Sequence, residues 1–325
     1  MTLEVRSFRA LYRLAWLVAA AGSSFSFIAC SSSEPAPTGA SAAGAAGDHG
    51  NADNGGAEGP GAGGSGPGDA GEGAIDTPPE PAVHAFSIKF DYRFDRAGFF
   101  DSAERRAALE AAAATWSALL SNDFLRVPAG TRLTLNDPED RERQVSVESL
   151  AQDIDDLLVF VGTSEAIPGY GRGGPAGSAE SSDATLQKSF SNRQTGKRFQ
   201  PWAGSISFKG SVDYFFDPTP ETSDDVPNDE YDFISLATHE LGHVLGFADS
   251  PAFSALEQGA TFTGKAAIAV YGGPVQLEAD LGHLADGPQS DGSEALMTPK
   301  LLNGRRLKPT ALDLAVLSDL GYSLK

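Results

Sequence analysis

Apolar and polar residues alternate in the first stretch of the chain that can build a buried surface. The apolar positions of this stretch are Phe86, Ile88, Phe90, Tyr92 and Phe94. A period of two residues is typical of a strand with one buried face, so we predict a half-buried strand over residues 86–94. His84 lies at the start of this strand, and we interpret it as a surface or packing residue.

Other segments of low polarity predict further strands and one loop. Residues 157–161 form a continuous apolar run, which is typical of a central strand covered on both faces. Shorter strands are predicted at 132–135 and 203–208. The glycine-rich residues 169–175 are predicted to form a loop, and they lack the Lys-Ser/Thr pair that a phosphate-binding loop requires.

Apolar residues at helical spacing predict a helix near each end of the folded region. The first helix begins at the capping residues 101–104 and continues to about Ser121. The last helix runs to Leu320, and Thr310 and Asp313 can cap its start. Strands and helices together indicate an α+β fold.

The most regular helical pattern lies between Asp232 and Asp249. Its apolar residues are Phe233, Leu236, Ala237, Leu241, Val244 and Leu245. Asp229 or Asp232 can cap the start, and Gly246 suits the turn that ends a helix. Gly242 inside the helix costs about 1 kcal/mol relative to alanine, and we interpret it as a place where a neighbouring segment packs close.

Two histidines lie four residues apart in this helix, in the run His239-Glu240-Leu241-Gly242-His243. Side chains at this spacing project from one face of a helix, about one turn apart, so both imidazoles can bind one cation. Glu240 can hold and deprotonate a water molecule beside that cation. This is the arrangement of a zinc hydrolase, in which imidazoles hold Zn²⁺ and the carboxylate acts as general base.

The N-terminal residues 1–30 resemble an export signal peptide. Arginines precede an apolar run that begins at Leu14, and this run is too short for a convincing membrane-spanning helix. Cys30 is the single cysteine, which excludes an intramolecular disulfide. The run Phe27-Ile28-Ala29-Cys30 resembles a bacterial lipobox and implies a membrane-anchored lipoprotein, while the alternative is a simple secretory cleavage site. In either case we expect an exported protein.

Composition divides the rest of the chain. Residues 31–82 are mostly Gly, Ala, Ser, Pro and acids and cannot bury a core, so we predict a disordered tether that leads to a folded domain at 83–325. The formal net charge of −20 argues against nucleic acid and against anionic membrane surfaces as partners. The acids between Asp213 and Asp232 could bind a structural Ca²⁺, although a solvated acidic loop is the simpler interpretation.

The residues after His243 extend the zinc-binding pattern. Gly246 follows three residues later, as in HExxHxxGxx[H/D], and the residues around Met297 resemble the methionine turn that comes downstream. In this order the motifs resemble those of metzincin metallopeptidases over about residues 83–325. The resemblance implies a twisted mixed sheet, an active-site helix and a loop-rich C-terminal subdomain that ends in a helix, with Met297 packed beneath the histidines. It also implies that strand 203–208 is the sheet edge over the cleft, which pairs with an extended peptide.

Zinc needs a third protein ligand, and two candidates stay open. Asp249 lies three residues after Gly246, where most metzincins have histidine and the snapalysin type has aspartate. His283 follows a segment that resembles the insertion of leishmanolysin-like metzincins. His283 is favoured because the other histidines, His49 and His84, lie in the tether and on the first strand, and because imidazole is the commoner partner for two imidazoles around zinc.

We therefore expect a zinc-dependent endopeptidase that acts on protein or peptide substrates. His239, His243 and His283 would hold Zn²⁺, and Glu240 would be the catalytic general base. Two alternatives stay open, namely a non-catalytic surface-binding lipoprotein that retains a metalloprotease fold, and a zinc hydrolase of a non-peptide substrate. The intact Glu240 argues against the first, because a protein without catalysis does not need this carboxylate.

Overall fold

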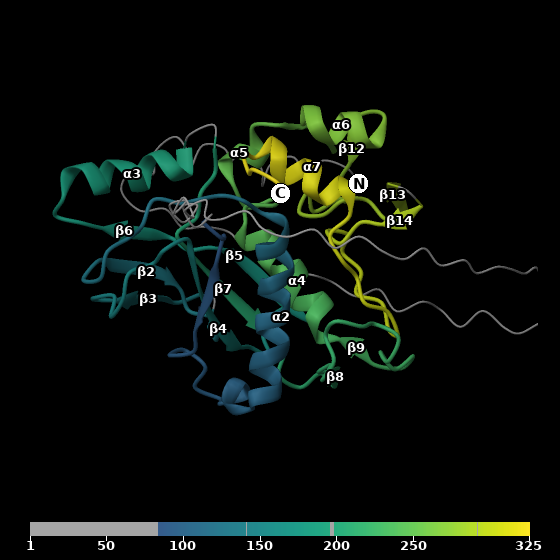
Figure 1. The fold of residues 1–325 in the computed structure, drawn as a ribbon, viewed down its shortest axis with the longest axis horizontal. Coiled ribbons are helices and arrows are strands. Elements are labelled where there is room, and N and C mark those ends of the chain that lie inside the picture. Colours follow the sequence, from purple (N-terminus) through teal and green to yellow (C-terminus); the bar gives the residue numbers. More distant parts are fainter. Residues whose placement is uncertain (1–83, 141, 196–197, 291) are drawn as a thin grey trace, which may run out of the picture. The chain divides into compact units, whose positions relative to one another are not determined.

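The computed structural model describes residues 84–140, 142–195, 198–290 and 292–325. The export signal predicted at 1–30, with Cys30, and the tether predicted at 31–82 lie outside the described residues. Within the described residues the fold is α+β, with helices packed on a mixed sheet (Figure 1). No helix in this part of the chain is both long enough and apolar enough to cross a membrane.

A mixed sheet of four strands, in the order β1-β4-β7-β5, lies at the centre of the described fold. Its strands are β1 (Ile88–Asp91), β4 (Leu157–Thr163), β7 (Ala203–Phe208) and β5 (Gly171–Pro175). The first three run parallel to one another, and β5 runs antiparallel to β7. The sheet therefore has two edges, formed by β1 and β5.

The central strands are buried on both faces. In β4, Val159 and Val161 belong to the hydrophobic core on one face, and Phe160 belongs to the core on the other. In β7, Ile206 belongs to the first core and Ala203 to the second. This alternation confirms the central strand that the apolar run at 157–161 predicts, because successive side chains of a strand point to opposite faces.

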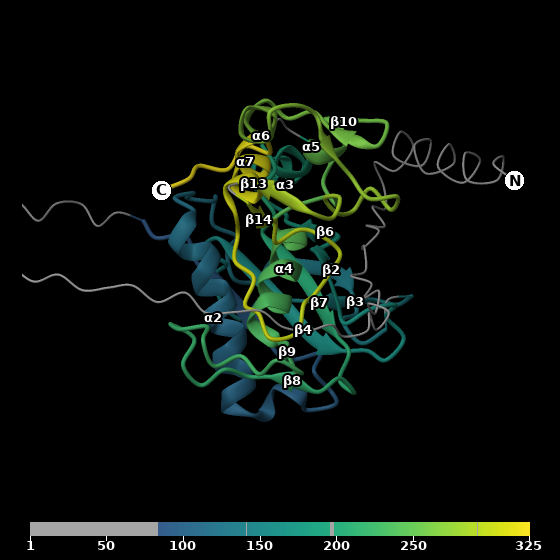
Figure 2. The same cartoon turned by 90° about the vertical axis from the view of Figure 1, so that its right-hand side faces the viewer.

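Helices cover one face of this sheet, and a second sheet lies on the other (Figures 1 and 2). The covering helices are α2 (Ala103–Leu119) and α4 (Phe233–Val244), with a 3₁₀ turn at Phe99–Asp101. Trp116 Nε1 of α2 donates a hydrogen bond to Thr238 O of α4 at 2.8 Å. The opposite face carries β2 (Arg132–Asn136), β3 (Gln144–Val147), β6 (Ser178–Glu180) and α3 (Ala184–Thr195).

The prediction that strand 203–208 is the sheet edge is wrong. This strand, β7, lies between β4 and β5, with Ile206 opposite Val161 on one side and Gly173 on the other. The edge next to β7 is β5, whose residues the sequence predicts to form a loop. Glycine has low strand propensity, so β5 owes its conformation to its pairing with β7 and its packing against α4 rather than to its own residues.

The chain after α4 consists of short elements and one last helix. They are α5 (Pro251–Ser254), β10 (Glu257–Gln258), β11 (Thr261–Phe262), α6 (Lys265–Tyr271), β12 (Val275–Gln276), β13 (Pro288–Ser290), β14 (Ser293–Glu294) and α7 (Ala311–Asp319). Thr310 and Asp313 form a capping box at the start of α7, as predicted. The buried Asp313 carboxylate also accepts hydrogen bonds from Leu296 N at 2.9 Å and Met297 N at 3.1 Å, so α7 holds the turn around Met297.

The interpretation of residues 213–232 as a solvated acidic loop is wrong for two of its carboxylates. Asp217 and Asp232 are buried, and both form ion pairs with the guanidinium of Arg306. Two short parallel strands also pair within this segment, namely β8 (Tyr214–Phe215) and β9 (Tyr231–Asp232). Among the described residues, the donor groups close enough to hold a metal ion lie elsewhere, so a Ca²⁺ site in this segment has no structural support.

Candidate metal centre

Helix α4 begins and ends at the residues that the sequence predicts. The Asp232 carboxylate caps the helix by accepting a hydrogen bond from Ser235 N at 2.9 Å. The last helical residue is Val244, and Gly246 has a φ of 102°, a left-handed value that glycine adopts without strain. Every residue of α4 is buried, so protein surrounds the helix and fixes the direction of its polar side chains.

Three histidine side chains converge beside α4. His239 and His243 come from the helix, and His283 comes from the loop after β12. One ring nitrogen of each lies within 4.8 Å of the other two, and the ring centroids are 4.9, 5.1 and 5.3 Å apart. All three side chains are buried. This histidine cluster can hold a metal ion, and Asp249, the other candidate ligand, is not part of it.

The helix histidines are oriented by hydrogen bonds from their Nδ1 atoms. Nδ1 of His239 donates to Leu296 O at 2.8 Å, and Nδ1 of His243 donates to Phe247 O at 3.0 Å. A carbonyl oxygen only accepts, so Nδ1 carries the hydrogen and the neutral ring presents the lone pair of Nε2. Both helix histidines are therefore in the tautomer that binds a metal through Nε2.

The two Nε2 atoms of the helix histidines lie 3.1 Å apart. Two nitrogens bound to one tetrahedral ion at about 2.0–2.1 Å lie about 3.3 Å apart, so the observed separation suits a shared ion. Burial, with a contribution from nearby His283, lowers the pKa of His239 to about 3. Burial also lowers the pKa of His243 well below its usual value. Both rings are thus neutral at neutral pH, which is the form that binds metal.

The turn around Met297 packs against α4, as the sequence predicts. Met297 is fully buried, and a Cβ added at Gly242 would lie 2.5 Å from its Sδ atom. Gly242 therefore has no side chain because Met297 occupies that space. The carbonyl that accepts from His239 belongs to Leu296 of the same turn, so the turn both supports the helix and orients one of its histidines.

His283 is held by the residues just before it. Its Nδ1 donates to Asp280 Oδ2 at 2.8 Å, and Gly282 N donates to Asp280 Oδ1 at 2.7 Å. Leu281 has a φ of 57°, a left-handed conformation that costs a residue other than glycine about 1–3 kcal/mol. Burial is the largest influence on the pKa of Asp280 and would raise it, but the hydrogen bond from His283, its electrostatic attraction and the backbone hydrogen bonds from Gly282 and His283 together outweigh burial, so the net shift is downward. Asp280 thus orients His283 as an ionised acceptor.

Glu240 lies between α4 and the edge strand β5. Its side chain is fully buried. A Cβ added at Gly171 would lie 2.5 Å from Glu240 Oε1, and a Cβ added at Gly173 would overlap the carbonyl oxygen of Glu240. The two glycines lie two residues apart and so face the same side of the sheet. Residues without side chains allow β5 to pass directly against Glu240, and the strand thereby limits where the carboxylate can lie.

Sequence reasoning grouped the three histidines of the cluster but missed most of the residues that hold them. The structure brings His283 to His239 and His243, and it leaves Asp249 out. Asp280 was missed, although an aspartate three residues before a candidate metal-binding histidine is a visible signal. Alternating glycines in β5 were also a signal, since glycines in a strand often mark a close approach of another backbone.

Comparison with protein-family models finds no match for this chain, and comparison with curated protein sequences finds none either. What the site can do therefore follows from its own residues. Three buried imidazoles lie together beside a helix that also carries a buried carboxylate.

Proposed function

We propose that the chain is a zinc-dependent endopeptidase with a metzincin-like catalytic domain. The convergence of three imidazole nitrogens beside the helix that carries Glu240 is the observation that carries this proposal. Three imidazoles are a donor set typical of catalytic zinc, which keeps one position open for water or substrate. Asp280 behind His283 fits the same assignment, because metal-binding histidines usually donate their other ring N–H to a carboxylate or carbonyl.

The chemistry divides between the ion and Glu240. A zinc ion in this position supplies Lewis acidity, which makes a water molecule acidic near neutral pH and polarises a substrate carbonyl. Glu240 takes the proton from the attacking water and later donates it to the leaving amine. His239 cannot take that proton in its place, because its Nδ1 already carries the hydrogen donated to Leu296 O and its Nε2 would bind the ion.

The edge strand β5 supports a peptide as the substrate. Within the described sheet β5 pairs only with β7, so its other side can offer N–H and C=O groups to an extended chain. The strand passes Glu240 at Gly171, so a peptide paired with β5 lies along the catalytic carboxylate. An ester or a small amide has no use for such an edge, which favours a peptide over a non-peptide substrate.

The variant Glu240→Gln tests the proposal, because it removes the base and keeps the shape of the side chain. We expect it to retain the native zinc content and to cleave denatured casein about 10²–10⁴-fold more slowly. Glu110→Gln, at an exposed position of α2, makes the same change of charge and should cleave at the native rate. Metal content is measured by mass spectrometry and cleavage by the release of soluble peptides, with and without a chelator.

Other outcomes separate the alternatives. Native cleavage by Glu240→Gln would remove Glu240 from the reaction and contradict the proposal. Bound zinc without cleavage of casein would favour a zinc hydrolase of a non-peptide substrate. A chain that binds no zinc at the histidine cluster would favour a surface-binding lipoprotein that retains the fold.

The cellular setting stays a prediction from the sequence. Export and lipid attachment at Cys30 would place the enzyme at a bacterial membrane, and cleavage without lipid would release it outside the cell. In both settings the substrates would be proteins or peptides of the extracytoplasmic space.

A further inference from the structure

A second group of metal-binding side chains lies outside the histidine cluster. It consists of His84 just before β1, Asp123 in the loop after α2, and Asp156 just before β4. One donor atom of each residue lies within 4.8 Å of the other two. None of these residues takes part in the proposed hydrolysis, so this second group needs an explanation of its own.

Asp156 is held in place by the surrounding backbone. Its side chain is fully buried. Its Oδ2 accepts hydrogen bonds from Ser87 N at 2.8 Å and Ser87 Oγ at 3.1 Å, and its Oδ1 accepts one from Phe124 N at 3.1 Å. A carboxylate has about four lone-pair positions, so one direction remains for a further partner. That direction faces His84, whose Nε2 lies 3.0 Å from both oxygens.

The spacing of the donor atoms suits a small cation. His84 Nε2 lies 3.0 Å from Asp156 Oδ1 and 3.9 Å from Asp123 Oδ1. Ligand atoms at about 2.0–2.2 Å from a tetrahedral ion lie about 3.4 Å apart, and the two observed distances bracket this value. The Asp123 side chain is 75% exposed, so it can move to complete the coordination.

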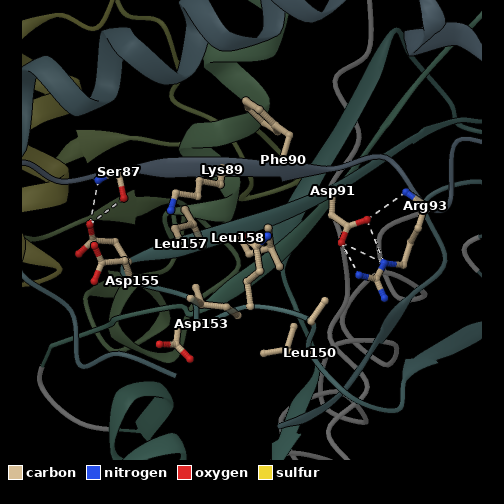
Figure 3. A pocket seen from close by; sticks show the side chains of 14 residues that line it. Ser87, Lys89, Phe90, Asp91, Arg93, Leu150, Asp153, Asp155, Leu157 and Leu158 are labelled. Carbon is tan, nitrogen blue, oxygen red and sulfur yellow. Dashed lines mark hydrogen bonds and ion pairs between the residues drawn. The ribbon is translucent and has the colours of Figure 1, made fainter. Parts of the chain in front are cut away.

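Asp156 also borders a neighbouring pocket, and charge favours a cation beside it. Ser87, Asp155 and Asp156 line a pocket of about 310 Å³ beside β1, whereas His84 and Asp123 do not line it, and Figure 3 shows Ser87 and Asp155 together at one end of it. The carboxylates of Asp123, Asp155 and Asp156 all lie close enough to His84 to act on it electrostatically. Three negative charges around one imidazole attract a cation.

We propose that His84, Asp123 and Asp156 form a second divalent-cation site that takes zinc or a transition-metal ion of similar size. One imidazole and two carboxylates, completed by water, suit such an ion, whereas Ca²⁺ takes about 6–8 oxygen ligands. Bound metal joins the start of the described fold to the loop after α2 and to the start of β4, and thereby stabilises this end of the domain. A proton on His84 Nε2 occupies the same position, so protons and metal compete for it.

The test uses the full chain with His283→Ala, because this change disrupts the histidine cluster and leaves the second group intact. Calorimetric titration with Zn²⁺ should show one saturable equivalent, and the unfolding temperature should rise as that equivalent binds. Adding Asp123→Asn or His84→Gln should abolish both effects. Asp224→Asn, an exposed residue outside both groups, is the matched control for charge and should change neither.

Absence of zinc binding in the His283→Ala chain would overturn the proposal, as would an equivalent that survives both Asp123→Asn and His84→Gln. Equal binding of Ca²⁺ in a parallel titration would overturn the identity of the ion. If His283→Ala does not fold, the native chain serves, since Asp123→Asn should then lose one of two zinc equivalents. The peptidase proposal is tested separately, by Glu240→Gln and by zinc binding at the histidine cluster. A negative result there would leave the second cation site unaffected.

Discussion

The histidines of the candidate metal centre reach one point from two kinds of structure. His239 and His243 lie on a regular helix, and backbone carbonyls orient their rings, whereas His283 lies on a loop and the carboxylate of Asp280 orients it. Helical spacing alone brings the first two together. The loop has no regular spacing that would place His283. Instead, the ionised carboxylate of Asp280 orients the ring, and Leu281 adopts a left-handed conformation just before it. If the cluster binds a metal ion, we expect substitutions at the loop to change the affinity in smaller steps than substitutions in the helix.

Removing His283 is the experiment with the largest expected effect on the difference between the helix histidines and the loop histidine. His283→Ala should lose zinc at the histidine cluster together with casein cleavage, and its affinity should fall by more than the roughly 10–100-fold that loss of an outer partner costs. Asp249→Ala should retain both, because Asp249 is not part of the cluster. Zinc retained against a competing chelator is the measurement. Loss of zinc in Asp249→Ala, with zinc retained in His283→Ala, would make Asp249 the third ligand.

Glu240, the proposed general base, is positioned by packing against β5. Gly171→Ala would push its carboxylate aside, since the new Cβ would lie 2.5 Å from Oε1. A displacement of about 1 Å near the reacting atoms can cost about 10²-fold in rate, so we expect a loss of that order in kcat with zinc retained. Gly273→Ala, where a Cβ meets nothing within 4 Å, is the control. An unchanged kcat would show that β5 does not position Glu240.

Asp280→Asn should weaken the loop half of the site without destroying it. Loss of such a partner costs about 10–100-fold in metal affinity, and we expect the lower end because the Asp280 side chain is 41% exposed. Asp286→Asn removes a charge from the same loop, where Asp286 pairs with Lys300 and not with a histidine. Zinc dissociation constants from chelator competition compare the two variants. Equal effects would mean that the backbone alone orients His283.

The parts of the site that could be predicted are those that local periodicity determines. The helix around His239 and His243 follows from apolar spacing, the Asp232 cap and Gly246, all of which lie within a few turns of one another. Gly242 even indicated the close packing that Met297 provides. Each of these features depends on residues that are close in sequence, so the amino-acid sequence is enough to predict it.

The parts that were missed depend on contacts between distant segments. β5 is a strand because β7 and α4 hold it, not because its glycines prefer that conformation. The ion pairs of Asp217 and Asp232 need Arg306, which no local pattern connects with them. His283 could be favoured by elimination among five histidines, but its partner Asp280 becomes evident only when the loop is folded.

Arg306 has a consequence for the order in which the domain can form. Its guanidinium bonds to Asp217 and Asp232 and to the carbonyl oxygens of Pro220 and Thr222. The helix that carries two of the three histidines is thus completed at its first turn by a residue 74 positions later in the chain. The start of this helix therefore makes its final contacts only after Arg306 has been synthesised, and the proposed peptidase activity would have to wait for that step.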